Sequence, residues 1–191
     1  AVTLAKMASG TDGNIISYDT SGNPVAVATG TDGQVLTSSG AGAVCAFEDA
    51  SGGDNTPSFL AYKTGSAQTI SDETDTKITF DTEDHDSDSA YSSDTFTVPS
   101  GEGGKYVINA GIYIDNSNPN KAHLKIYKNG AEYARATNSW YHASSVNTTF
   151  IATLAATDYI EIYGWHNSGV DRNANQNYKY CYFGMYKLLG V

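Results

Sequence analysis

Apolar and polar residues alternate along most of the chain after residue 58, which is the period of half-buried β-strands. The clearest run begins at Lys105 and puts five alternate apolar side chains on one face: Tyr106, Ile108, Ala110, Ile112 and Ile114. Shorter runs of this kind cover 58–62, 76–81, 95–98, 122–127, 145–154, 157–163 and 177–188. Because long amphipathic helical patterns are missing, the sequence predicts an all-β sandwich or barrel.

Turn residues separate these runs. Pro99 cannot donate to a sheet ladder, so it ends the strand before it, and glycines follow within 100–104. Asn129-Gly130 predicts a tight hairpin turn, because both residues tolerate positive φ. Two polar stretches, 81–94 and 165–176, are predicted to be long loops.

The N-terminal stretch contains an internal repeat with a period of 20 residues. The segment 10–17 recurs as 30–37, and Val25 and Val27 have counterparts in Cys45 and Phe47. Each unit reads as two short strands around a glycine-containing turn, a β-hairpin with too little apolar surface to fold alone. The alternative is a flexible Gly/Ser-rich linker. The strict offset of the apolar positions favours hairpins that stack with other copies of the chain.

Four ordered motifs in the C-terminal part resemble the C1q-like globular heads, which are relatives of tumour necrosis factor. They are Phe96-Thr97-Val98-Pro99 followed by Gly104-Lys105-Tyr106, then Tyr127-Lys128-Asn129-Gly130, Thr157-Asp158, and Phe183-Gly184-Met185-Tyr186. Thr157 stands where the family usually has Gly. The resemblance covers about two thirds of the chain and implies a jelly-roll head that forms homotrimers. The N-terminal repeat in turn resembles the Asp-Gly-Gln-Val-Leu-Thr repeats of phage tail-fibre and virion-appendage proteins.

The two resemblances divide the chain into three parts. We expect a stem or anchor of hairpin repeats over 1–50, a linker over 51–57, and a C1q-like jelly-roll head over 58–191. In the terminal strand of the head both faces are apolar or aromatic, so one face is expected to fill the sandwich and the other to meet a neighbouring subunit. The predicted trimer interface is Tyr178, Tyr180, Tyr182 and Tyr186.

Charge and composition narrow the function classes. The 191 residues carry a formal net charge of −10 with a pI of about 4.6. Such a surface repels phosphate and anionic lipid, so we expect no nucleic-acid partner. No run reaches membrane-spanning length, and we expect no membrane insertion. The two cysteines, Cys45 and Cys181, are predicted to be small buried apolar residues.

Metal and catalytic chemistry find little support in the sequence. The acidic stretch 81–94 contains Asp84, Asp86 and Asp88, which are candidate calcium ligands. At EF-hand spacing they need Gly and Glu where Ser89 and Thr95 stand, so a solvated acidic loop is favoured and no cofactor is expected. No phosphate loop, zinc-protease helix or nucleophile elbow occurs, and we expect no enzyme.

The stretches around the two tryptophans are the candidate contact sites. Trp and Tyr rings stack on sugar surfaces or enter protein interfaces, while His, Asn and Arg bind hydroxyl groups. The predicted ligand-binding residues are Trp140, Tyr141, His142, Trp165, His166, Asn167 and Arg172. The alternative is that the tryptophans pack inside the head or in the trimer interface.

We therefore expect a non-enzymatic trimeric virion appendage, located on the tail fibre or capsid exterior, that binds a host-surface glycan or protein. Its N-terminal segment is expected to contact other virion proteins. The alternative is a structural head-fibre or capsid decoration protein anchored through the same segment.

Overall fold

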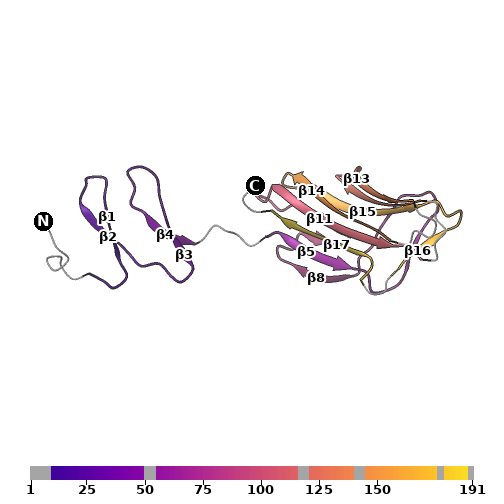
Figure 1. The fold of residues 1–191 in the computed structure, drawn as a ribbon, viewed down its shortest axis with the longest axis horizontal. Coiled ribbons are helices and arrows are strands. Elements are labelled where there is room, and N and C mark those ends of the chain that lie inside the picture. Colours follow the sequence, from indigo (N-terminus) through magenta and orange to yellow (C-terminus); the bar gives the residue numbers. More distant parts are fainter. Residues whose placement is uncertain (1–9, 50–54, 116–120, 140–144, 176–178, 189–191) are drawn as a thin grey trace. The chain divides into compact units, whose positions relative to one another are not determined.

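The computed structural model describes residues 10–49, 55–115, 121–139, 145–175 and 179–188, and every regular element in these ranges is a β-strand. No helix in these ranges is long and apolar enough to cross a membrane. The chain divides into two compact units, Ala1–Gly53 and Asp54–Val191 (Figure 1).

The N-terminal unit consists of two β-hairpins, as the repeat predicts. Strand β1 (Ile15–Tyr18) pairs with β2 (Pro24–Val27), and β3 (Gln34–Thr37) pairs with β4 (Ala46–Asp49). Both pairs are antiparallel, and each remains a separate two-stranded sheet. The two hairpins differ in register: Ile15 lies opposite Val27, whereas Phe47 lies opposite Leu36 instead of Val35. A one-residue shift exchanges the two faces of a strand, so the repeats are alike in sequence but not in which side chains share a face.

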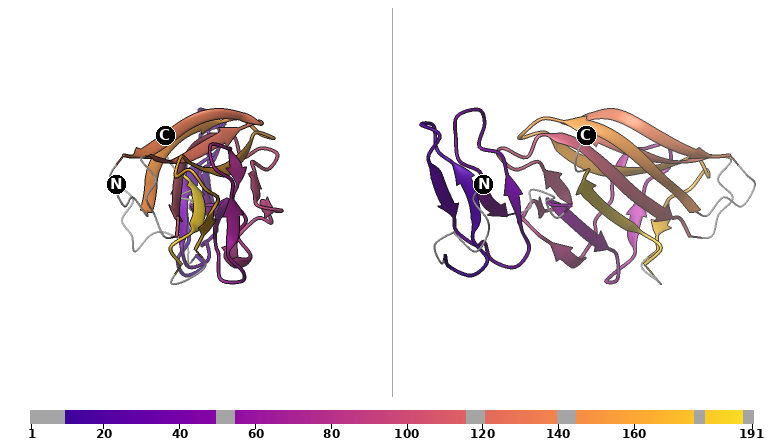
Figure 2. Two further views of the ribbon diagram at one scale, coloured as in Figure 1. Left: turned by 90° about the vertical axis from the view of Figure 1, so that its right-hand side faces the viewer. Right: turned by 60° about the vertical axis from the view of Figure 1, so that its left-hand side comes forward.

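The C-terminal unit is a sandwich of two antiparallel sheets, visible as two layers in Figure 2. The five-stranded sheet has the order β14-β11-β17-β5-β8. Its strands are β14 (Ser145–Leu154), β11 (Gly104–Tyr113), β17 (Tyr182–Lys187), β5 (Ser58–Tyr62) and β8 (Thr82–Asp86).

The six-stranded sheet has the order β13-β12-β15-β10-β9, and β7 pairs with β15. Its strands are β13 (Ala131–Asn138), β12 (Ala122–Lys128), β15 (Tyr159–His166), β10 (Thr95–Thr97), β9 (Tyr91–Ser92) and β7 (Thr76–Lys77). Strands β6 (Gln68–Ile70) and β16 (Arg172–Ala174) pair with each other as a separate antiparallel ribbon.

The core lies between the two sheets and follows the predicted alternation. On β11 and just after it, the five apolar residues expected on one face are all fully buried. Phe183 and Met185 of β17, with Cys181 just before the strand, are buried in the same cluster, as expected for one face of the terminal strand. Phe59 and Phe96 approach each other from opposite sheets, with ring centroids 5.1 Å apart. Burial of these apolar side chains is the main favourable contribution to the fold.

Two neighbouring turns close one end of the six-stranded sheet. Asn129 and Gly130 both take positive φ, 53° and 79°, as predicted. Asp158 holds this turn, since its carboxylate pairs with Lys128 (2.7 Å) and accepts a hydrogen bond from the Asn129 side chain (2.7 Å). These contacts lower the pKa of Asp158 to about 2. Thr157 takes a φ of 71°, a conformation in which the family's usual glycine is unstrained.

Three expectations about secondary structure need correction. The stretch 81–94 is not one loop, because Thr82–Asp86 forms the edge strand β8 against β5. The stretch 165–176 is not one loop either, because β15 continues through His166 and Arg172–Ala174 forms β16. In 76–81 only Thr76–Lys77 pairs as a strand, although Ile78 and Phe80 are both buried as expected.

Candidate ligand-binding surface

The outward side of the six-stranded sheet carries a row of aromatic and charged side chains. On β15 the residues alternate between half-buried and buried, so that Trp165 and Tyr163 point away from the core. The pairing of β12 with β15 puts His123 opposite Trp165 and Lys125 opposite Tyr163. We call these four residues, together with Tyr127, the aromatic face.

The rings of the aromatic face lie in two stacked pairs. The His123 and Trp165 ring centroids are 4.6 Å apart with an interplanar angle of 29°. The Tyr127 and Tyr163 centroids are 4.0 Å apart with an angle of 28°. Stacking of this kind fixes the rings. Tyr127, Tyr163 and Trp165 are half-buried and keep part of their surface available to a ligand, whereas His123 is buried beneath this surface.

Charged side chains surround these rings and are held by ion pairs. Lys125 Nζ lies 2.5 Å from an Asp75 carboxylate oxygen and 3.3 Å from Glu132. Glu132 also pairs with Arg135 at 2.5 Å, and Arg135 keeps 48% of its side chain exposed. Tyr127 donates a hydrogen bond to Asp75 at 2.7 Å, which raises the pKa of Tyr127 to about 12. The aromatic face thus has positively and negatively charged hydrogen-bonding groups in fixed positions next to its flat apolar rings.

His123 is a titratable group in direct contact with the indole of Trp165. Its Nδ1 lies 2.8 Å from Thr137 Oγ1 across the β12–β13 pair. Burial lowers the pKa of His123, and the charges of Arg135 and Lys125 lower it further. The imidazole is therefore predominantly neutral at pH 7, which suits stacking on Trp165.

The lowered pKa of His123 predicts a loss of stability in mild acid. Below about pH 6.5 the unfolded chain binds a proton at His123 that the folded head resists, so the unfolding free energy falls as the pH falls. We expect His123→Gln to lose less stability than the wild type between pH 7 and pH 5, as measured by urea midpoints at each pH. His85→Gln is the matched control, because the side chain of His85 is 52% exposed. An unchanged pH dependence in His123→Gln would contradict the assignment.

The structure separates the ligand-binding residues predicted from sequence. Trp165 belongs to the aromatic face, but on a strand and not in a loop. His166 is fully buried, and its Nε2 donates to the Ile70 carbonyl at 2.9 Å. Its ring therefore holds β15 against β6 and is not exposed to a ligand, contrary to expectation.

The other predicted contact residues have structural partners or lie outside the described residues. The Asn167 side chain accepts a hydrogen bond from the Lys121 backbone at 2.8 Å. Half-buried Arg172 donates from Nε to Ser168 Oγ at 3.1 Å. The three residues of the other aromatic stretch, Trp140, Tyr141 and His142, are outside the described residues.

The outward side of the five-stranded sheet contains the predicted interface tyrosines and an apolar strip among polar side chains. Tyr182 and Tyr186 are half-buried there, and Tyr180 stacks on Tyr113 with centroids 5.2 Å apart. Tyr178 lies outside the described residues. Ile151 of β14 keeps 59% of its surface exposed. We call Ile151, Val107, Tyr182 and Tyr186 the apolar face.

Register explains why these side chains form one surface. Val107 lies opposite Ile151 on one side and Tyr186 on the other, so the three form a row across the sheet. The Tyr182 ring lies over Gly111, where an added Cβ would come within 2.4 Å of it. The sequence had not predicted as contact residues Ile151 and Val107, nor His123, Lys125, Tyr127 and Tyr163. The sequence signal that could have found them is the strand alternation itself. These residues occupy the positions between the buried core residues, so they lie on the outward face of each strand.

The candidate calcium ligands form hydrogen bonds and an ion pair with other groups of the protein. The Asp86 carboxylate accepts backbone hydrogen bonds from Ala90 at 3.0 Å and Tyr91 at 2.8 Å, which caps the turn after β8. Asp84 pairs with Lys179 at 3.6 Å, and Asp88 bonds to Ser87. Within the described residues, no three His, Cys, Asp or Glu side chains come together as metal ligands.

Comparison with known proteins identifies the fold. Neither a protein family nor a curated protein matches the sequence. Among solved structures, murine APRIL at pH 8.0 matches with a TM-score of 0.54 at 12% identity, over 69% of this chain and 98% of that chain. Eiger TNF from S. frugiperda matches with a TM-score of 0.51 at 13% identity, over 70% of this chain and 93% of that one. The globular domain of zebrafish complement 1qA has a TM-score of 0.48 at 12% identity, over 70% and 98%.

The class of protein follows from the first two matches and from the strand order. The C-terminal unit is a jelly roll of the tumour-necrosis-factor type, so the predicted all-β C1q/TNF-like fold is confirmed. Identities of 12–13% establish the fold alone.

Proposed function

We propose that this chain is a non-enzymatic, trimeric virion appendage whose jelly-roll head binds a glycan or protein on the host surface. The observation that carries the proposal is the contrast between the two outward surfaces of the head. The apolar face exposes Ile151 and is the surface we assign to contact between copies, while the aromatic face combines flat rings with fixed charged groups. Three copies of a weak site on one head raise avidity for a surface that presents many ligands.

The remaining features of the chain agree with this role. The repeated hairpins of 10–49 provide a stem and an anchoring segment for other virion proteins. The formal net charge of −10 disfavours nucleic acid and anionic membranes as partners. The proposed location is the virion surface, on a tail fibre or on the capsid exterior.

Binding by the aromatic face is tested with Trp165→Ala. Removing an aromatic anchor from the centre of a contact surface typically weakens binding by about tenfold or more. We expect that loss when labelled protein is titrated onto a panel of bacterial cells and their purified surface polysaccharides. Tyr133→Ala is the control, because Tyr133 is an exposed ring on β13 that packs against Phe150 and not against the aromatic face.

Two outcomes are informative in different ways. Unchanged binding in Trp165→Ala would exclude the aromatic face as the site while leaving a host-binding role. A wild-type protein that binds nothing on the panel would favour the structural alternative, a capsid decoration protein. Gold-labelled antibody on intact particles separates these roles, since label on capsid faces excludes a position at the tail tip.

A further inference from the structure

Within its described residues, 10–49, the N-terminal unit has almost no core of its own. Among residues 10–49, Val27 is the only buried apolar side chain. Five large apolar side chains of the same unit are exposed: Ile15, Ile16, Tyr18, Val35 and Leu36. Two-stranded hairpins are marginally stable at best in water, so this apolar surface needs a partner.

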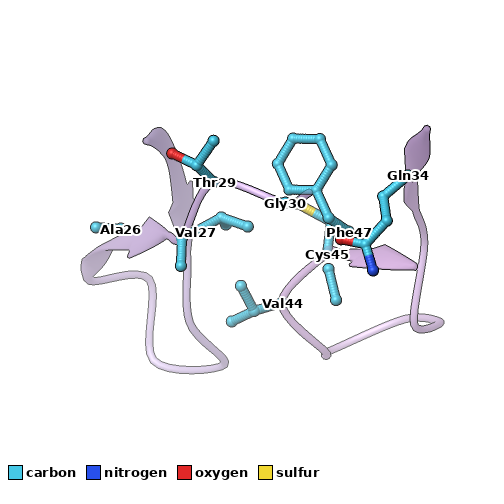
Figure 3. A pocket seen from close by; sticks show the side chains of 10 residues that line it. Ala26, Val27, Thr29, Gly30, Gln34, Val44, Cys45 and Phe47 are labelled. Carbon is cyan, nitrogen blue, oxygen red and sulfur yellow. The ribbon is translucent and has the colours of Figure 1, made fainter. Parts of the chain in front are cut away.

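The two hairpins of the unit enclose an open cavity of about 400 Å³ (Figure 3). Val27 of the first hairpin and Val44, just before β4 in the second hairpin, point into the space between the ribbons, with Phe47 above Gly30. Cys45 also lines the cavity and is half-exposed, not buried as its sequence suggested. A cavity of this size falls in the range that holds small ligands, so it has room for partner side chains.

The chemistry of the lining selects an apolar occupant. None of the residues that line the cavity is charged. The polar ones already have partners within the chain: Gln34 accepts from the Thr31 backbone at 2.9 Å and donates to Asp49 at 3.0 Å. Thr29 donates to the Asp12 carbonyl at 3.1 Å. A sugar or an ion would therefore find few groups to bind, whereas an aliphatic or aromatic side chain would lose apolar surface to water there.

The first hairpin presents the complementary side chains on its other face. Val27 shares its face with Ile15, its partner in register, so Ile16 and Tyr18 lie on the opposite face. Ile16 is 51% exposed and Tyr18 is 65% exposed. One unit thus has a cavity on one side and projecting apolar side chains on the other. Contacts between two such different patches run head to tail, and they close into a ring when the rotation allows it.

We propose that the cavity of one copy holds Ile16 and Tyr18 of the next copy, so that three N-terminal units close into a ring. The inference rests on the trimeric state of the proposed function. The heads of such a trimer would keep the three N-terminal units within reach of one another, since the 50–57 segment spans about 30 Å at most. This tethering gives the units a high effective concentration, so that a contact too weak for isolated hairpins forms within the trimer.

The cavity contains a native reporter, the thiol of Cys45. In the full-length variant Ile16→Cys, the new thiol would lie in the cavity of the neighbouring copy, near its Cys45. Mild oxidation should then yield covalent trimers on a non-reducing gel, roughly tenfold faster than in the control Ser21→Cys, as expected for a tethered reaction. Ser21 is exposed in the turn of the same hairpin, so its cysteine reports random collision. Adding Cys45→Ser to Ile16→Cys should abolish the covalent trimer, because buried Cys181 is not accessible.

The native mass of the unoxidised protein tests the trimeric state separately from the ring of N-terminal units. A native trimer whose Ile16→Cys form cross-links no faster than Ser21→Cys would overturn the ring of N-terminal units and leave the trimeric head intact. A cross-link confined to single chains would overturn it as well, because the cavity would then be filled by its own hairpin. A native monomer would overturn both the ring and the trimeric appendage.

Discussion

Replacing Phe59 by alanine is expected to destabilise the head by about 3–5 kcal/mol, the usual cost of removing a buried phenyl ring. Phe59 is at the centre of the core, stacked on Tyr91 at 4.6 Å and in edge contact with Phe183 at 4.7 Å. It also stacks on Phe96, which belongs to the opposite sheet. The substitution therefore leaves a cavity between the sheets. The surrounding aromatic rings are held by their own packing and cannot fill it completely. Since small domains have only about 5–15 kcal/mol of stability, the loss would be a large fraction of it.

The loss can be measured as the unfolding free energy in urea at a fixed protein concentration, because oligomerisation also contributes to apparent stability. Phe59→Leu is the matched variant, since it keeps most of the volume and is expected to cost less than about 1.5 kcal/mol. A loss below about 1 kcal/mol in Phe59→Ala would mean that this cluster is not the packed centre of the sandwich.

The core was predictable because buried strands leave a strong periodic signal. On β11, Tyr106 and Ile108 begin an alternation that burial on one side of a sheet requires, and the structure follows it without a shift. The Asn129-Gly130 turn was equally predictable, since its sequence selects a backbone conformation that few other residue pairs tolerate. Both signals are local, and both survive in the folded chain.

Elements whose partners are distant in sequence could not be predicted in the same way. Strand β8 is rich in acidic residues, yet it pairs along β5, because edge strands need only backbone hydrogen bonds and accept charged side chains. The continuation of β15 through Trp165 and His166 depends on its pairing with Ala122 and His123, which no local pattern encodes. Apart from Trp165, the aromatic face was not predicted for the same reason, since its residues come from different strands and meet only in register.

Replacing Ile151 by aspartate is expected to convert the proposed trimer to monomers. Ile151 is 59% exposed in a single chain, so the variant head should fold normally. In the row with Val107 and Tyr186 it lies in the proposed contact surface, where an unpaired carboxylate would be buried. Burying such a charge costs roughly 3–5 kcal/mol, which corresponds to a weakening of association of about 10² to 10³-fold or more at each contact.

Sedimentation at several protein concentrations measures this shift directly, and circular dichroism checks that the variant keeps its strands. Val170→Asp is the control, because Val170 is 55% exposed in the β15–β16 connection and belongs to neither face of the sandwich. If Ile151→Asp remains trimeric, the apolar face is not the contact between copies. If the wild type is itself a stable monomer, the proposed trimer is wrong, and exposed Ile151 is then an ordinary surface residue of the head.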